Sequence, residues 1–154
     1  QLALSSIGQY DVAASPLQMA MVAAGIANDG VLMEPYLTKS VRAANLQTVW
    51  THKDTPMSTP MTRESAKQLQ QMMVSVVNNG TGRNARIDGV TVGGKTGTAQ
   101  TSPDKPPYAW FVGWSDKPKV AVAVFVESSN TERSEIAGGR LGAPIARDVI
   151  EALR

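Results

Sequence analysis

The sequence of 154 residues contains no cysteine and a single histidine. The lack of cysteine excludes disulfides, cysteine-ligated zinc sites and a thiol nucleophile, and one histidine is weak support for any metal site. Charged residues make up 18% of the chain, below the ~25% of an average soluble domain. We therefore expect no metal and no cofactor.

A strong charge of either sign and long apolar runs are also missing. Fifteen Lys and Arg residues against thirteen Asp and Glu residues leave a formal net charge of +2, so nucleic acid is not an expected partner. The apolar runs 19–27 and 120–126 fall far short of the ~20 residues that cross a bilayer. The chain begins with Gln1 and has no signal-peptide pattern, so we expect a piece of a longer protein.

Apolar periodicity predicts two internal helices and a closing one. Ser15 and Pro16 form a cap and first-turn pair for a well-buried helix that ends at 28–30, and Thr62 caps a second helix that ends at 78–80. The positions expected to face the core are Leu17, Ala20, Met21, Ala24 and Ala27, then Ala66, Leu69, Met72, Met73, Val76 and Val77, and finally Ile145, Ala146, Val149, Ile150 and Leu153.

Alternating and β-branched residues predict five strands. Residues 36–42 and 47–51 are expected to form a hairpin, and a loop is expected between Pro56 and Pro60. Strands over 90–100, 109–115 and 119–127 should form an antiparallel meander. Helices before antiparallel strands, with one helix last, predict an α+β domain in which helices pack on the sheet. No repeat or composition shift marks a second domain.

The segment Gly89–Thr96 matches the phosphate-cradle pattern G-x-x-x-x-G-K-[ST]. That cradle requires a buried strand before the first glycine and a helix that begins at the lysine. Residues 82–88 are too polar for the strand, and prolines at 103, 106 and 107 oppose the helix. A nucleotide site would require measurable, magnesium-dependent nucleotide binding, and we expect none.

The alternative interpretation of the same segment is a strand edge that lines an acyl-transfer cleft. Lys95-Thr96-Gly97-Thr98 offers a fixed cation, two hydroxyls and a backbone amide side by side. Alternation places Lys95 and Gly97 on one face and the two threonines on the other, so twist and pleat must bring them to one rim. Gly97 would leave room for a ligand backbone.

Several blocks of the chain resemble, in order and spacing, the C-terminal half of the transpeptidase domain of class B, monofunctional penicillin-binding proteins. The similarity runs from about Gly8 to the final helix and is carried by residues 15–20, 26–30, 95–100 and 109–113. It implies an α/β sandwich of the penicillin-binding and serine β-lactamase type, incomplete in this chain. Residues 1–154 would then be the C-terminal part of one such domain.

The resemblance implies a serine D,D-transpeptidase. In this family a serine in Ser-x-x-Lys attacks the penultimate D-alanine of a peptidoglycan stem peptide, and the acyl group passes to a neighbouring amine. β-Lactams acylate the same serine. The parent protein would work at the extracytoplasmic face of the bacterial cell membrane, held by an N-terminal transmembrane helix that lies outside this sequence.

Site residues carry over only at the matching strand. Lys95 and Thr98 would be catalytic, with the Lys95 ammonium supplying positive potential and the Thr98 N–H forming half of the oxyanion hole. Thr96, Gly97 and Thr98 would bind the substrate.

No residue of this chain matches the nucleophile. Ser102-Pro103-Asp104-Lys105 fits Ser-x-x-Lys and Ser128-Ser129-Asn130 fits Ser-x-Asn, but both follow the lysine strand, opposite to the family order. We expect them to be coincidences. The nucleophile should lie on an N-terminal segment of the same parent protein, which docks on this chain, and the chain alone should be inactive.

Two other functions stay open. A serine β-lactamase or β-lactam-sensor domain would share the nucleophile but differ in deacylation, and a non-catalytic binding module would use the lysine strand only for packing.

Three other sets of residues receive structural interpretations. His52 is expected at the surface without a catalytic role, and the Met72-Met73 pair in the core. Trp110, Phe111 and Trp114 are expected to form core or cleft wall, with Tyr108 and Trp110 nearest the cleft.

Overall fold

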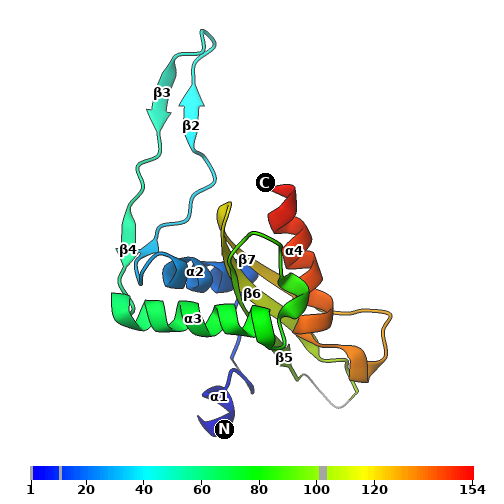
Figure 1. Cartoon of the computed structure of the whole chain (residues 1–154). Coiled ribbons are helices and arrows are strands. Elements are labelled where there is room, and N and C mark those ends of the chain that lie inside the picture. Colours follow the sequence, from blue (N-terminus) through cyan, green and yellow to red (C-terminus); the bar gives the residue numbers. More distant parts are fainter. Residues whose placement is uncertain (1, 11, 101–103) are drawn as a thin grey trace.

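A computed structural model describes residues 2–10, 12–100 and 104–154 of the chain (Figure 1). Its helices and strands are α1 (Leu2–Ser5), α2 (Pro16–Ala27), β1 (Leu32–Met33), β2 (Ser40–Arg42), β3 (Thr48–Thr51), β4 (Pro56–Ser58), α3 (Arg63–Asn79), β5 (Val92–Ala99), β6 (Tyr108–Asp116), β7 (Lys119–Val126) and α4 (Ala143–Ala152). The expected α+β class, with helices on an antiparallel sheet, is confirmed. Among the described residues no helix is long and apolar enough to cross a membrane.

The central sheet has three antiparallel strands in the order β5-β6-β7. Its ladders run without a break from Val92 opposite Ser115 to Ala99 opposite Tyr108, and then across to β7. The predicted meander is confirmed. Both β5 and β7 keep one edge that no other strand of the described chain pairs with, and these edges matter for the site.

Each face of the sheet carries its own core. On one face Phe111, completely buried, packs with α4 and with Ala85 and Ile87 after α3. On the other face Trp114 packs with Ile26 of α2 and Met73 of α3. Figure 1 shows α2 and α3 side by side across the sheet, with α4 apart from them.

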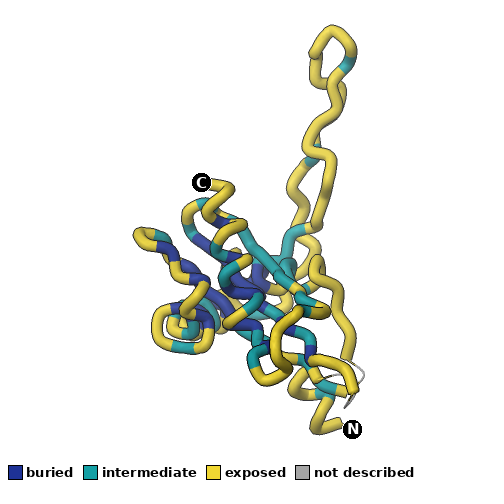
Figure 2. The backbone as a smooth tube through the Cα atoms, turned by 90° about the vertical axis from the view of Figure 1, so that its right-hand side faces the viewer, coloured by how far each residue is buried: buried dark blue, intermediate teal, exposed yellow. Residues whose placement is uncertain are grey.

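A long hairpin projects from this body. β2 and β3 pair at its far end, β1 and β4 pair at its base, and nearly all of its residues are exposed (Figures 1 and 2). The sequence predicted the hairpin but gave β2 the longer range 36–42. It also placed a loop where β4 lies, because a proline at a strand's first position signals a break in sequence but is tolerated in an edge strand.

The predicted helix caps are present. The Ser15 hydroxyl accepts from the Gln18 N–H at 3.2 Å, and the Gln18 side chain accepts from the Ser15 N–H at 2.8 Å, so the two form a capping box. At α3 the Thr62 hydroxyl accepts from the Ser65 N–H at 3.1 Å. These bonds satisfy N–H groups that have no partner inside a helix.

The predicted buried faces of the helices are partly wrong. In α2 the buried residues are Ala23, Gly25 and Ile26, whereas Leu17 is 59% exposed. In α3 Met73 is buried, but Met72 is 56% exposed, so the expected core pair is split. In α4 the described chain buries Ala143, Ala146 and Ile150 and leaves Ile145, Val149 and Leu153 exposed. Apolar periodicity identifies every apolar face of a helix, including faces that no other part of the described chain covers.

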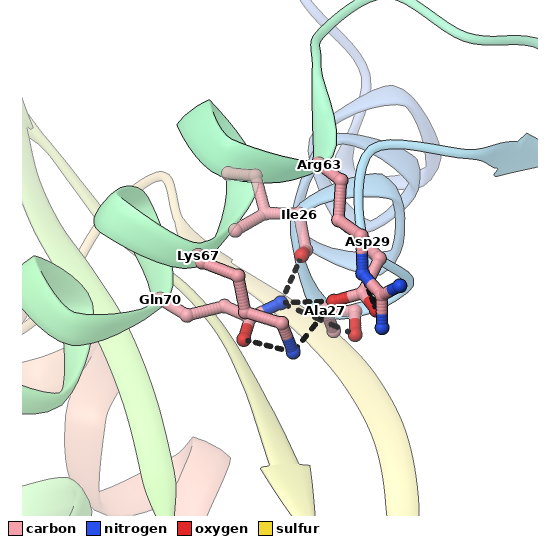
Figure 3. A network of polar contacts seen from close by, with 6 residues as sticks. All are labelled: Ile26, Ala27, Asp29, Arg63, Lys67 and Gln70. Carbon is pink, nitrogen blue, oxygen red and sulfur yellow. Dashed lines mark hydrogen bonds and ion pairs between the residues drawn. The ribbon is translucent and has the colours of Figure 1, made fainter.

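A polar network joins the end of α2 to the start of α3 (Figure 3). The Asp29 carboxylate pairs with Lys67 at 2.7 Å and with Arg63 at 3.1 Å. Gln70 donates to the Ile26 carbonyl at 2.7 Å and to Asp29 at 3.3 Å. The hydrogen bond from Lys67, followed by that from Gln70 and the two positive charges, lowers the pKa of Asp29 below its usual value.

This lowered pKa sets the pH dependence of one stabilising contribution. The folded state favours the charged Asp29 carboxylate, so these interactions stabilise the fold fully above the ordinary Asp pKa of ~4. The stabilisation is lost as the pH falls through the lower pKa that Asp29 has in the folded protein. We expect Asp29→Asn to lower the thermal unfolding midpoint by a few degrees at pH 7, and the difference from wild type to vanish at low pH. Thermal denaturation followed by circular dichroism at several pH values measures this.

Asp54→Asn serves as the matched control, because Asp54 is exposed at the base of the hairpin. It should leave the midpoint unchanged at every pH. Asparagine also tolerates the left-handed backbone of Asp29, whose φ is +55°, so Asp29→Asn adds no strain. An unfolding midpoint of Asp29→Asn equal to wild type at pH 7 would contradict a stabilising role.

Candidate functional site

The lysine segment lies in β5, an edge strand of the central sheet. Gly93 to Thr96 are extended and paired with β6, and no helix begins at Lys95. The phosphate-cradle hypothesis is therefore wrong, as its context indicated. The strand-edge interpretation requires an edge that no other strand pairs with, and β5 has such an edge among the described strands.

Two adjacent glycines let aromatic rings lie against both faces of β5. A Cβ added at Gly93 would lie 2.5 Å from the ring of Trp114, and one added at Gly94 would lie 2.3 Å from the ring of Phe111. Both rings are buried, which confirms their packing role. Gly94, which the phosphate-cradle pattern shares, and Gly93 beside it are thus needed for close ring packing next to the lysine.

Lys95 reaches the free edge of the strand although its Cβ lies on one face. Its ammonium donates to the carbonyl oxygen of Thr96 at 2.6 Å, and the residue is exposed. Above Gly97, on the same face, a Cβ would meet only Trp110, at 3.2 Å. The lysine charge and an open glycine surface therefore lie next to each other at this edge.

The two threonines line a pocket on the opposite face. The pocket, of about 640 Å³, is bounded by β5, by the loop after α3 and by the turn Gly138–Gly142. The Thr96 hydroxyl shares a hydrogen bond of 2.7 Å with the Thr81 hydroxyl. The residues that line it are Gly80, Thr81, Arg83, Asn84, Thr96, Thr98, Ala137, Gly138, Gly139 and Arg140.

Close backbone packing holds the walls of this pocket. A Cβ on Gly138 would lie 1.9 Å from the Trp110 carbonyl oxygen, and one on Gly139 would lie 2.1 Å from the Thr81 carbonyl oxygen. Asn84 donates to the Gly139 carbonyl at 2.8 Å. The Arg140 guanidinium pairs with the carboxylate of Glu135. The positions of the strand, the loop and the turn are therefore fixed relative to one another.

A side chain from far along the chain also binds β5. The Gln9 amide donates to the Thr98 carbonyl at 3.3 Å and accepts from the Gln100 N–H at 3.2 Å. These backbone groups must point away from β6. Because the N–H and C=O of one residue point the same way in an antiparallel strand, the Thr98 N–H also faces the free edge.

The other sequence candidates lie elsewhere. His52 is in the hairpin, half-buried against Tyr36 with ring centroids 3.7 Å apart, so it is less exposed than expected. Trp110 is half-buried and tilts against Phe125. Tyr108 also contacts Phe125 edge-on. Within the described ranges, no three His, Cys, Asp or Glu residues are placed to hold a metal ion.

The structure describes only one of the two strings that imitate family motifs in full. Ser102 and Pro103 of the first lie outside the described residues. Ser128-Ser129-Asn130 forms a loop after β7, on the strand farthest from β5.

Several residues of the site were not predicted. The sequence predicted only a helix end at 78–80, and Asn84, Arg140 and Gln9 were not singled out. Thr81 follows a helix stop and Arg140 follows a glycine pair, so each has a local signal for a turn. Neither signal indicates that the turn packs beside Thr96.

The chain matches the family model described as the penicillin binding protein transpeptidase domain over residues 1–151. It is 42% identical over 98% of its length to the peptidoglycan D,D-transpeptidase PbpA of Mycolicibacterium smegmatis. A structure of penicillin-binding protein A from Mycobacterium tuberculosis, a ceftriaxone acyl-enzyme complex, matches with a TM-score of 0.89 and 39% identity, over 98% of this chain and 35% of that one. The penicillin G acyl-enzyme complex of the same protein matches at 0.84 and 40%, over 99% of this chain and 35% of that one. The chain spans 31% of the PbpA relative's length.

The bond between the Thr81 and Thr96 hydroxyls generates a stability prediction. Thr81→Val keeps the shape of the side chain but removes the bond, so the free energy of unfolding should fall by about 1 kcal/mol. Thr81→Ser keeps a hydroxyl group and should retain most of the stability that the bond contributes. Urea denaturation measures the difference, and Thr48→Val on the exposed strand β3 should change stability by less than about 0.5 kcal/mol. Equal stabilities of Thr81→Val and wild type would show that the bond contributes nothing.

Proposed function

This chain belongs to the penicillin-binding protein transpeptidase domain family, and we propose from this that it forms the C-terminal part of a peptidoglycan D,D-transpeptidase domain. The observation that carries the proposal is the edge of β5, where the Lys95 ammonium, the Thr98 N–H and the Thr96 hydroxyl border unpaired backbone. Such an edge can bind an extended peptide by adding it as a strand.

Each residue of the edge has a role in acyl transfer. Lys95 provides a permanent positive charge for the substrate carboxylate without reorganisation during the reaction. Thr96 and Thr98 hydrogen-bond that carboxylate, and Gly97 permits close approach of the substrate backbone. The Thr98 N–H stabilises the oxyanion that develops as the acyl-enzyme forms.

The attacking serine belongs to a preceding segment of the same protein. Ser-x-x-Lys occurs in this sequence only at Ser102, which follows the lysine strand instead of preceding it. The described surface supports docking of such a segment. Ile145, Val149 and Leu153 are 46%, 44% and 58% exposed and share one face of α4 by their spacing.

The unpaired edge of β7 supports docking as well. After Lys119 the strand reads Val-Ala-Val-Ala-Val-Phe-Val, apolar on both faces, which is typical of an interior strand. Edge strands are normally protected by charges or by proline, and this one carries only the lysine at its start. A strand and a helix from the preceding segment would cover both surfaces.

The substrates and the location follow from the same proposal. Stem peptides of peptidoglycan are the donors, and β-lactams acylate the serine in their place, as they do in the similar acyl-enzyme structures. The domain works on the extracytoplasmic side of the bacterial membrane, tethered by an N-terminal anchor. A serine β-lactamase would instead hydrolyse penicillin with rapid turnover, so stable labelling favours the transpeptidase.

Lys95→Ala in the full-length protein tests the function. Because the charge at the edge is lost, labelling by fluorescent penicillin should slow by about 100-fold or more. The exposed lysine contributes little to folding, so the unfolding midpoint should not change. Lys39→Ala in the hairpin is the matched control and should label normally. Normal labelling of Lys95→Ala would contradict the proposal. It would favour a non-catalytic binding module in which the lysine strand only contributes packing.

A second experiment tests the docking of the preceding segment. When the two parts are co-produced, they should elute together in gel filtration, and penicillin should label the preceding segment. Val149→Glu places a charge in the apolar stripe of α4 and should abolish co-elution. Val41→Glu, at an equally exposed valine of the hairpin, should not. Unchanged co-elution of Val149→Glu would contradict docking on this face.

A further inference from the structure

Gln9 makes contacts that its own segment does not require. It is half-buried, whereas its neighbours Gly8 and Tyr10 are exposed. Its amide binds two backbone groups of β5, the Thr98 carbonyl and the Gln100 N–H, which are 89 and 91 residues away in sequence. No bond within residues 2–10 is formed through this side chain in the described structure.

The backbone around Gln9 carries strain. Gly8 and Tyr10 have φ values of +74° and +64°, so the residues on both sides of Gln9 are left-handed. Glycine adopts positive φ without strain, but tyrosine does so rarely and at an energetic cost, so the strain lies at Tyr10. Because such conformations persist only where the surroundings hold them, the bonds from Gln9 to β5 are a physical reason for this one.

The two bonds are those that a neighbouring strand would make. A side-chain amide has the donor and the acceptor of a peptide group, and Gln9 uses both on residues 98 and 100. The backbone of β5 is therefore paired on both sides at this point, by β6 and by Gln9. Toward Lys95 no strand of the described chain pairs with this edge, and the Thr96 carbonyl there accepts from the Lys95 ammonium.

We propose that Gln9 is a positioning residue that holds the end of β5 and thereby fixes the Thr98 N–H in the orientation that an acyl donor needs. This inference rests on the proposed function. The Thr98 C=O is bound by Gln9, and its N–H belongs to the same extended residue and faces the same edge. A small rotation of this residue would turn the N–H away from the developing oxyanion, and misplacement on this scale is costly in enzymes.

Gln9 also sets where the binding edge ends. Its amide occupies the Thr98 carbonyl and the Gln100 N–H, so an extended peptide can still use the Thr98 N–H but cannot pair with the strand beyond it. The donor is thereby kept in one register, with its reacting carbonyl at the Thr98 N–H and its carboxylate toward Lys95.

The experiment compares Gln9→Met with wild type in the full-length protein. Methionine has a similar length but cannot donate or accept these bonds. We expect the rate constant of acylation by penicillin G to fall about tenfold, while the dissociation constant of the non-covalent complex changes less than twofold. Gln71→Met, at an exposed glutamine of α3, is the matched control and should behave as wild type.

Amide hydrogen exchange provides a readout that does not depend on activity. In wild type the Gln100 N–H should be protected, and in Gln9→Met its exchange should accelerate at least tenfold while Phe111 in β6 stays protected. Rapid exchange of Gln100 in wild type would overturn the inference even if the variant failed to fold. Unchanged or faster acylation of a folded Gln9→Met protein would overturn it too, since Gln9 would then be structural or obstructive.

The two proposals fail in different ways. If wild type is not acylated, or if Lys95→Ala is acylated normally, the proposed function fails. If wild type is acylated and Lys95→Ala is not, but Gln9→Met acylates as wild type does, only the role of Gln9 is overturned.

Discussion

The structure depends on the close packing of two aromatic rings against two adjacent glycines in β5. Trp114 lies over Gly93 on one face of the sheet, and Phe111 lies over Gly94 on the other. Each ring belongs to a different core, one formed with α2 and α3 and one formed with α4. The strand is therefore fixed from both faces immediately before Lys95, and a side chain larger than glycine at either position would push it away from β6.

Because β5 is fixed from both faces, its edge can be rigid and still be open to binding a partner strand. Edge strands are usually mobile or protected because their backbone groups are unpaired. Here the buried half of β5 is held by the rings, the threonine face is held by the loop after α3 and the turn 138–142, and the far end is held by Gln9. The segment around Lys95 is left as rigid, unpaired backbone, which is the arrangement that preorganised catalysis requires.

The exposed apolar surfaces have a different explanation from the exposed edge of β5. The free edge of β7 and the outer stripe of α4 are apolar without any counterpart in the described chain. A continuous apolar surface on a stable domain marks a place where something packs. The same chain thus has the lysine strand β5 at one edge of a small sheet and the apolar strand β7 at the other, with a second exposed apolar surface on α4.

Local sequence was sufficient for the three longer helices, the three strands of the central sheet and the class of the fold, but not for β1 and β4. Capping residues at Ser15 and Thr62, the glycine stops and the alternation in β6 and β7 act through neighbours in the chain, so they could be interpreted without coordinates. The residues of the lysine strand were found in the same way, because Lys95-Thr96-Gly97-Thr98 is contiguous.

Tertiary structure decided which apolar faces are buried and what surrounds the strand. Met72 and Met73 have the same chemistry, and only the position of α3 on the sheet buries one and exposes the other. Thr81, Gly139 and Gln9 meet Thr96 and Thr98 through chain separations of 15 to 89 residues, and no local pattern encodes such contacts. Sequence periodicity reports the polarity of a face, whereas its neighbours depend on how the whole chain packs.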